Sequence, residues 1–153
     1  MKKYQISYLS AEFYKKYNSS DYPEIEHKEE RPYLVLLIKI DENTFAIPFR
    51  TNVDHNSCYK FKNSQRETNS STGLDYSKAV IVNNPEYISF PATIDNSEYI
   101  ELNKKYFFII KQFTSYVSDY KLFVSGELNE YKSKKYRYTT LKYFHEELGI
   151  LDN

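Results

Sequence analysis

Residues 33–49 read YLVLLIKIDENTFAIPF, and this stretch decides the fold. Its first part, 33–40, is apolar almost throughout, which indicates a strand buried in the middle of a sheet. Asp41, Glu42 and Asn43 are residues typical of a turn, and 44–49 again has strand character. The stretch therefore predicts an antiparallel hairpin at the centre of the protein.

Shorter signals extend the sheet on both sides of this hairpin. Tyr4, Ile6 and Tyr8 alternate with polar residues, which predicts a half-buried strand, and Ser10 can cap a short helix after it. Further strands are predicted at 59–61 and at 78–82, KAVIV, while the boundaries within 84–101 stay open.

Two helices are predicted in the second half of the chain. Asn103 can cap a long one, and a last one begins at Thr139 or Thr140 and ends at Gly149. The apolar stripe expected to pack the long helix on the sheet is Phe107, Ile110, Phe113, Val117, Tyr120 and Val124; the stripe of the last helix is Leu141, Phe144 and Leu148. Strands followed by helices predict an α+β fold with a twisted, largely antiparallel sheet.

Composition places the chain in a broad class. Its 153 residues fit a single domain over 1–153, and 17 Tyr and 10 Phe supply much of the core. Lys and Arg balance Asp and Glu at 21 each, so attraction to an anionic partner must be local. A single cysteine and an N-terminus without a signal-like apolar run lead us to expect a cytoplasmic protein. Basic residues gather in two places along the chain. One group is Lys60, Lys62 and Arg66, and the other lies within 132–142.

The residues with chemical potential follow two of the predicted strands. They lie in 48–55, PFRTNVDH, and in 73–80, GLDYSKAV. Strand ends hold side chains rigidly and leave them open to a ligand. Together they offer cations, hydroxyls, an amide, an imidazole and a carboxylate, a set that suits a phosphate: Arg50, Thr51, Asn52, His55, Asp75, Ser77 and Lys78.

Cutting RNA internally needs little more than such a set. The 2′-hydroxyl is the nucleophile, so the protein supplies a base, donors for the charge that develops on the phosphoryl oxygens, and an acid for the leaving oxygen. An imidazole such as that of His55 serves as base or acid near neutral pH. Arg50 can bind a phosphate through two donors, and Lys78 can act as a point charge.

Each of these residues also has an ordinary structural interpretation. A histidine after a strand is more often a surface or loop residue than a catalytic one. Arg50 and Lys78 can be solvated charges at the edges of strands, and Asp75 can be a turn residue. The residue types alone therefore leave both interpretations open.

The paired motifs IPFRTNVDH (47–55) and GLDYSKAVIV (73–82) resemble those of type III toxin-antitoxin toxins of the CptN and TenpN kind, related to ToxN and AbiQ. In that family a strand that ends in proline and an apolar residue leads into arginine, a hydroxyl residue, a small polar residue and then histidine. The second motif has glycine, an aliphatic residue, aspartate, an aromatic residue, a hydroxyl residue, lysine and alanine. The matching residues are Pro48, Phe49, Arg50, Thr51, Asn52 and His55, then Gly73, Leu74, Asp75, Tyr76, Ser77, Lys78 and Ala79.

The resemblance implies a fold and an activity. The fold is that of the MazF and Kid toxins, a strongly twisted antiparallel sheet of the SH3-like barrel type flanked by helices. The activity is cleavage of messenger RNA without metal or cofactor, and the partner is a structured antitoxin RNA made from tandem repeats. One position departs from the family, because ToxN has Thr-Ser-Pro-Lys where this chain has TNVDH (51–55), so His55 would take the place of that lysine.

These lines give the expected site. The catalytic residues are predicted to be Thr51, His55 and Lys78. Residues predicted to orient them or to bind RNA are Arg50, Asn52, Asp75 and Ser77, with Lys60, Lys62 and Arg66 extending the RNA path. Two other interpretations remain: a non-catalytic RNA-binding domain, which needs only the basic path, and a protein-interaction module, in which the basic residues would scatter over the surface.

Overall fold

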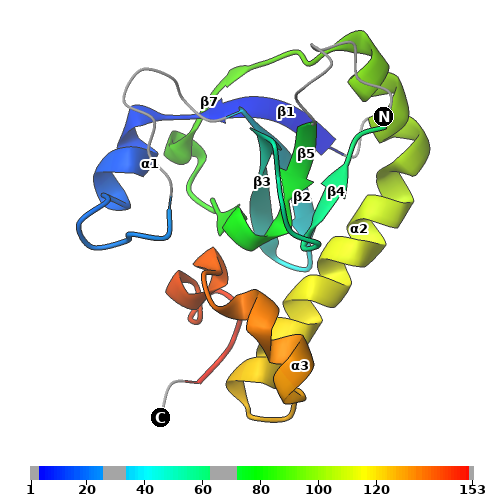
Figure 1. The fold of residues 1–153 in the computed structure, drawn as a ribbon. Helices are drawn as coiled ribbons and strands as arrows, with labels where there is room; N and C mark the ends of the chain where they lie inside the picture. The colour runs from blue at the N-terminus through cyan, green and yellow to red at the C-terminus, as the bar shows by residue number, and fades with distance from the viewer. Residues whose placement is uncertain (1–3, 26–33, 63–71, 152–153) are drawn as a thin grey trace.

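The computed structural model describes residues 4–25, 34–62 and 72–151 and shows an antiparallel sheet with one long helix alongside it (Figure 1). The strands are β1 (Tyr4–Leu9), β2 (Leu34–Ile40), β3 (Asn43–Thr51), β4 (Cys58–Lys60), β5 (Thr72–Asp75), β6 (Val80–Ile81) and β7 (Ile88–Pro91). The α-helices are α1 (Ala11–Lys16), α2 (Asn96–Val124) and α3 (Glu130–Ser133). Four short 3₁₀ helices complete the order: η1 (Tyr76–Lys78), η2 (Pro85–Tyr87), η3 (Lys134–Tyr136) and η4 (Thr140–Tyr143).

The predicted central hairpin is confirmed. β2 and β3 pair in antiparallel register from Val35 opposite Pro48 to Ile40 opposite Asn43. Asp41 adopts a φ of 56°, in the left-handed region that Asp and Asn tolerate better than most residues, so the turn chemistry closes the hairpin. Most of both strands is buried.

The sheet has the order β4-β5-β3-β2-β1-β7, with β6 also pairing with β3. Every pairing is antiparallel. β3 is long enough to serve two sets of partners, because its first part pairs with β2 and β6 and its end, Phe49 to Thr51, pairs with β5. The predicted α+β fold with an antiparallel sheet is thus confirmed.

The first strand and short helix are also as predicted. The side chain of Ser10 caps α1 by accepting a hydrogen bond from the Phe13 amide at 3.3 Å. Phe13 is fully buried, and its ring lies 4.9 Å from that of Tyr17, which fixes the short helix to the core.

The long helix begins earlier than predicted, and its buried face coincides only in part with the predicted stripe. Asp95, not Asn103, precedes its first residue. Its buried apolar residues are Leu102, Ile109, Phe113, Tyr116 and Tyr120. Of the predicted stripe, Phe113 and Tyr120 are buried, Ile110 and Val117 are partly buried against the core, and Phe107 is 70% exposed. Apolar residues occur all around this helix, so periodicity alone allows more than one orientation of the helix about its axis. Contact with the sheet selects one of them.

Two other predicted elements are corrected in detail. The predicted strand at 78–82 is shorter, since Lys78 ends η1 and the strand holds only Val80–Ile81. The last predicted helix is the 3₁₀ helix η4, although its stripe Leu141, Phe144 and Leu148 is buried as expected. Gly149 follows with a φ of 70°, the conformation expected of a glycine at the end of such a segment.

None of the helices in the described parts of the chain is long and apolar enough to cross a membrane. The C-terminal segment from α3 onward lies beside the end of α2 and returns toward the sheet (Figure 1). Thr140 brings this segment into contact with the residues around η1, because its hydroxyl donates to the backbone oxygens of Ser77 and Ala79. The end of the chain is thereby held against η1, next to the second sequence motif.

Candidate nucleic-acid interface

The two motifs meet because β3 and β5 pair with each other. Arg50 lies opposite Gly73 in this pairing, which places its side chain near Asp75, two residues farther along β5. The Arg50 Nη1 atom is 2.5 Å from Asp75 Oδ2, and the Asp75 side chain is fully buried. Asp75 also caps the start of η1, where its Oδ1 accepts hydrogen bonds from the Ser77 amide at 3.0 Å and the Ser77 hydroxyl at 2.6 Å.

His55 completes this arrangement from the loop after β3. Its Nε2 lies 3.2 Å from Asp75 Oδ1 and 3.4 Å from the Ser77 hydroxyl oxygen. Its Nδ1 accepts a hydrogen bond from the Ser57 amide at 3.1 Å, so in the neutral ring the proton belongs on Nε2 and faces the carboxylate. We call Arg50, His55, Asp75 and Ser77 the Asp75 cluster.

The geometry limits what the cluster can do. It is not a serine-histidine-aspartate relay, because Ser77 and Asp75 both contact the same ring nitrogen of His55. Proton transfer to or from a substrate requires His55 to exchange one of its present partners for that substrate. The ring is 37% exposed, so it can be reached from solvent. Asp75 instead serves to orient a guanidinium and an imidazole side by side.

Lys78 is held by backbone oxygens. Its Nζ donates to the carbonyl oxygen of Glu24 at 3.1 Å and to that of Tyr138 at 3.2 Å. The side chain therefore ties the segment between α1 and β2 to the C-terminal segment. The predicted catalytic role of Lys78 stays a prediction, and the structure adds a structural role to it.

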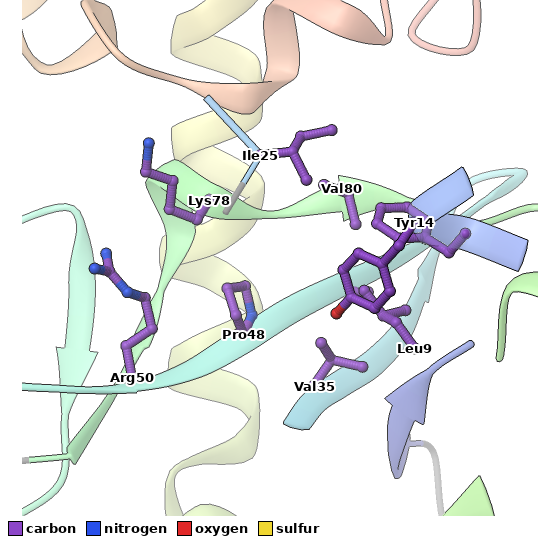
Figure 2. Close-up of a pocket in the computed structure, with 10 residues that line it drawn as sticks. Leu9, Tyr14, Ile25, Val35, Pro48, Arg50, Lys78 and Val80 are labelled. Carbon is purple, nitrogen blue, oxygen red and sulfur yellow. The ribbon is translucent and has the colours of Figure 1, made fainter. Parts of the chain in front are cut away.

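Arg50 and Lys78 also stand on the same side of a small apolar pocket, with the nitrogen ends of both side chains directed away from Pro48 and Leu9 (Figure 2). The volume of this pocket is about 30 Å³. That is room for about one water molecule and not for a nucleobase. The pocket lies beside the aliphatic parts of the Arg50 and Lys78 side chains and is too small to be a ligand site.

Thr51 and Asn52 are placed differently from the rest of the predicted site. Both side chains are exposed at the end of β3, where Thr51 pairs with Thr72 and Asn52 has a φ of 55°. Neither lines the two large hollows beside the Asp75 cluster, which are described next. Their predicted roles stay predictions without a contact to the cluster.

The larger hollow, which we call the basic groove, has a volume of about 1020 Å³. Three members of the Asp75 cluster line it, namely Arg50, His55 and Ser77, together with residues of the loop before β4, of η1, of α2 and of the C-terminal segment. Among the residues that the structure describes, Asp119 is the one acidic residue that lines it. Its cationic residues are Arg50, Lys78, Lys111, Lys132, Lys134, Lys135 and Arg137, and its exposed aromatic residues are Phe108, Tyr131 and Tyr138.

A second hollow of about 330 Å³, the lysine hollow, adjoins the basic groove. Lys60, Lys62 and Lys105 line it. The two hollows share four residues, so they meet there: His55, Asn56, Phe108 and Gln112. Of the predicted RNA path, Lys60 and Lys62 thus lie near the cluster, while Arg66 lies outside the described residues.

Sequence reasoning missed the contribution of α2 to this surface. The sequence pattern predicts a helix that contains Phe108, Lys111 and Gln112, but it does not place these residues at the site, where they line the basic groove. The basic run over 132–137 was visible in the sequence, yet no local signal placed it opposite the motifs. A positive run that is interrupted by tyrosines was the one available hint.

The described residues hold no group of three or more His, Cys, Asp or Glu side chains that could bind a metal ion. Comparison with known proteins gives no match to a family model, to a curated protein or to a solved structure. Function is therefore inferred from the chemistry of the site and from the sequence motifs.

Proposed function

We propose that this protein is a metal-independent endoribonuclease, the toxin of a type III toxin-antitoxin system that cuts messenger RNA and is inhibited by a repeat-derived, structured antitoxin RNA. The observation that supports this proposal is the position of the Asp75 cluster. An arginine and an imidazole, both oriented by one buried carboxylate, line the basic groove, and the imidazole also lies where this groove meets the lysine hollow. RNA that follows the cations passes these two groups.

The proposed reaction is an internal transfer at phosphorus. The 2′-oxygen bonds to the adjacent phosphorus, the bond from phosphorus to the 5′-oxygen breaks, and the products carry a 2′,3′-cyclic phosphate and a 5′-hydroxyl. One proton leaves the 2′-hydroxyl and one joins the 5′-oxygen, and His55 is the proposed carrier of one of them. Arg50 binds the phosphoryl oxygens, with Lys78 and Thr51 as further donors.

The proposal includes the partner and the finer fold. A protein without net charge needs a local cationic surface to bind RNA, and the basic groove supplies one. The sharing of β3 between β2 and β5 supports a bent, barrel-like sheet of the MazF and Kid type. Such a toxin acts in the cytoplasm, where messenger RNA is available.

A second candidate function is a non-catalytic RNA-binding domain. It is favoured by the engagement of both His55 ring nitrogens and by the backbone contacts of Lys78, which suit residues that stabilise a binding surface. The two functions separate in one experiment. Purified protein is incubated with labelled RNA, and the ends of any fragments are analysed: cyclic phosphate ends support the nuclease, and intact RNA in a stable complex supports the binding domain.

Cleavage is expected to continue in excess EDTA. The reason is that the reacting groups proposed here are side chains and the substrate hydroxyl, none of which needs a metal ion. The measurement is the rate of fragment formation with chelator, with magnesium, and with neither. Activity that disappears in chelator and returns with magnesium would contradict the proposed mechanism.

Binding of RNA is expected to weaken steeply as salt rises, because each phosphate contact releases a bound counterion. Charge reversal at Lys60 and Lys62 should flatten the slope of log Kd against log salt by roughly one unit for each contact that is lost. Reversal of Lys15 and Lys16, on the short helix α1, is the matched control and should leave the slope unchanged. If both charge reversals change the slope equally, RNA does not bind specifically along the lysine hollow.

A further inference from the structure

The junction of the two hollows contains an exposed aromatic ring beside an amide side chain. Phe108 is 51% exposed and Gln112 is half-buried, and both line the basic groove and the lysine hollow. They are four residues apart on α2, so their side chains lie next to each other on one face of the helix. His55 and Asn56 face the same junction from the loop after β3.

The Phe108 ring is supported from below. The Tyr59 ring meets it edge to face, with 6.3 Å between the ring centroids. Tyr59 is buried, and its hydroxyl donates to Glu101 Oε2 at 2.5 Å, so it cannot turn away. The Phe108 ring thus packs on an anchored, buried tyrosine, while about half of the side chain is exposed and lines both hollows.

Gln112 is held in one orientation by the core. The Tyr76 hydroxyl donates to its Oε1 at 2.9 Å. Tyr76 is buried, and this burial raises the pKa of its phenol, so the hydroxyl keeps its proton and stays a donor. The group that Gln112 offers to a ligand is then its Nε2 amide, with two N–H donors.

We propose that this junction is a subsite for one unpaired nucleobase, which stacks on Phe108 and accepts a hydrogen bond from Gln112. A flat ring in a cationic hollow is the arrangement by which proteins bind single-stranded nucleic acid, with stacking on the ring and phosphates on the flanking cations. Lys111 in the basic groove and Lys105 in the lysine hollow stand on the two sides of Phe108 along α2. A paired base has both faces covered, so the subsite selects single strands.

This proposal rests on the RNA-binding part of the proposed function, and its test does not depend on cleavage. The ligands are three short fluorescent oligonucleotides with 2′-deoxy sugars, which lack the nucleophile: a single strand, a strand of equal length without bases, and a duplex. The variants are Phe108→Ala and Phe107→Ala. Phe107 is a matched control because it is exposed on the same helix and lines neither hollow.

Phe108→Ala should weaken binding of the single strand ~5-fold to ~150-fold, the range observed when a stacking aromatic residue is removed. Binding of the strand without bases and of the duplex should be unchanged, and Phe107→Ala should bind all three ligands as the wild type does. Single-strand binding that Phe108→Ala leaves intact, or an equal loss for the strand without bases, would overturn the subsite. If the protein passes this test but never cuts RNA, the subsite is supported and the proposed nuclease activity is contradicted.

The hydrogen bond is tested separately through base preference. Short single strands of equal length and different base composition are compared with the wild type, Gln112→Leu and Tyr76→Phe. Gln112→Leu should reduce the spread of their dissociation constants. Tyr76→Phe should do the same, because loss of the Tyr76 hydroxyl frees the Gln112 amide to turn. If both variants keep the spread of the wild type, Gln112 does not read the base.

Discussion

Asp75→Ala is expected to lower the free energy of unfolding by ~3 kcal/mol, the lower end of the range for removing one partner of a buried charge pair. The Asp75 side chain is fully buried and accepts hydrogen bonds from Arg50 and from the amide and hydroxyl of Ser77. Without it, a buried amide loses its acceptor and a guanidinium loses its counterion. Arg50 is 29% exposed and can turn toward water, so the lower end applies.

The measurement is urea unfolding followed by a spectroscopic signal of the tyrosine-rich core. Asp54→Ala is the control, because Asp54 is an exposed carboxylate in the loop that leads to His55. It should change stability by no more than ~0.5 kcal/mol, as is usual for surface substitutions. If the two variants unfold at the same urea concentration, the Asp75 cluster does not contribute to stability as its geometry indicates.

The central part of the fold could be predicted because its signals are local. An apolar run, three turn residues and a second run define β2 and β3 without reference to distant residues. The cap of α1 by Ser10 is equally local. These features depend on backbone preferences and on burial of one short segment, which the sequence shows directly.

Which residues of α2 face the core could not be predicted in full, because the orientation of this helix depends on groups that are far apart in the chain. Glu101, near the start of α2, is buried, and its carboxylate accepts hydrogen bonds from the Tyr59 hydroxyl and the Lys62 amide. A charged residue in such a position normally faces water, so the sequence pattern favours a different orientation. Here the carboxylate satisfies a tyrosine and a loop amide that are about forty residues away.

The candidate site shows the same division. Arg50, His55, Asp75 and Ser77 come together as their positions after strands suggested, because β3 and β5 are paired. The contact of Lys78 with two backbone oxygens could not be foreseen, since it depends on where the C-terminal segment returns. The side of the groove that α2 and the C-terminal segment form was missed for the same reason.

His55→Ala is expected to reduce the rate of RNA cleavage by ~100-fold or more, the usual scale for loss of a general acid or base. RNA binding should largely survive, because the cations of the basic groove and the lysine hollow are unchanged. The fold should also survive, since Asp75 keeps Arg50 and Ser77 as partners. The measurements are single-turnover cleavage, binding of an uncleavable RNA analogue and urea unfolding.

Lys78→Ala is the comparison that separates the two kinds of role. Loss of its contacts with the backbone oxygens of Glu24 and Tyr138 should loosen the C-terminal segment, so stability and RNA binding should fall together with cleavage. A residue that carries a proton behaves differently, because it affects the rate and its pH dependence. A plot of the wild-type cleavage rate against pH should therefore contain a sloping limb. This limb should be absent in His55→Ala and kept in Lys78→Ala. If His55→Ala cuts at the wild-type rate, His55 is a loop residue held by Asp75, and the base must be sought among Lys78 and its neighbours.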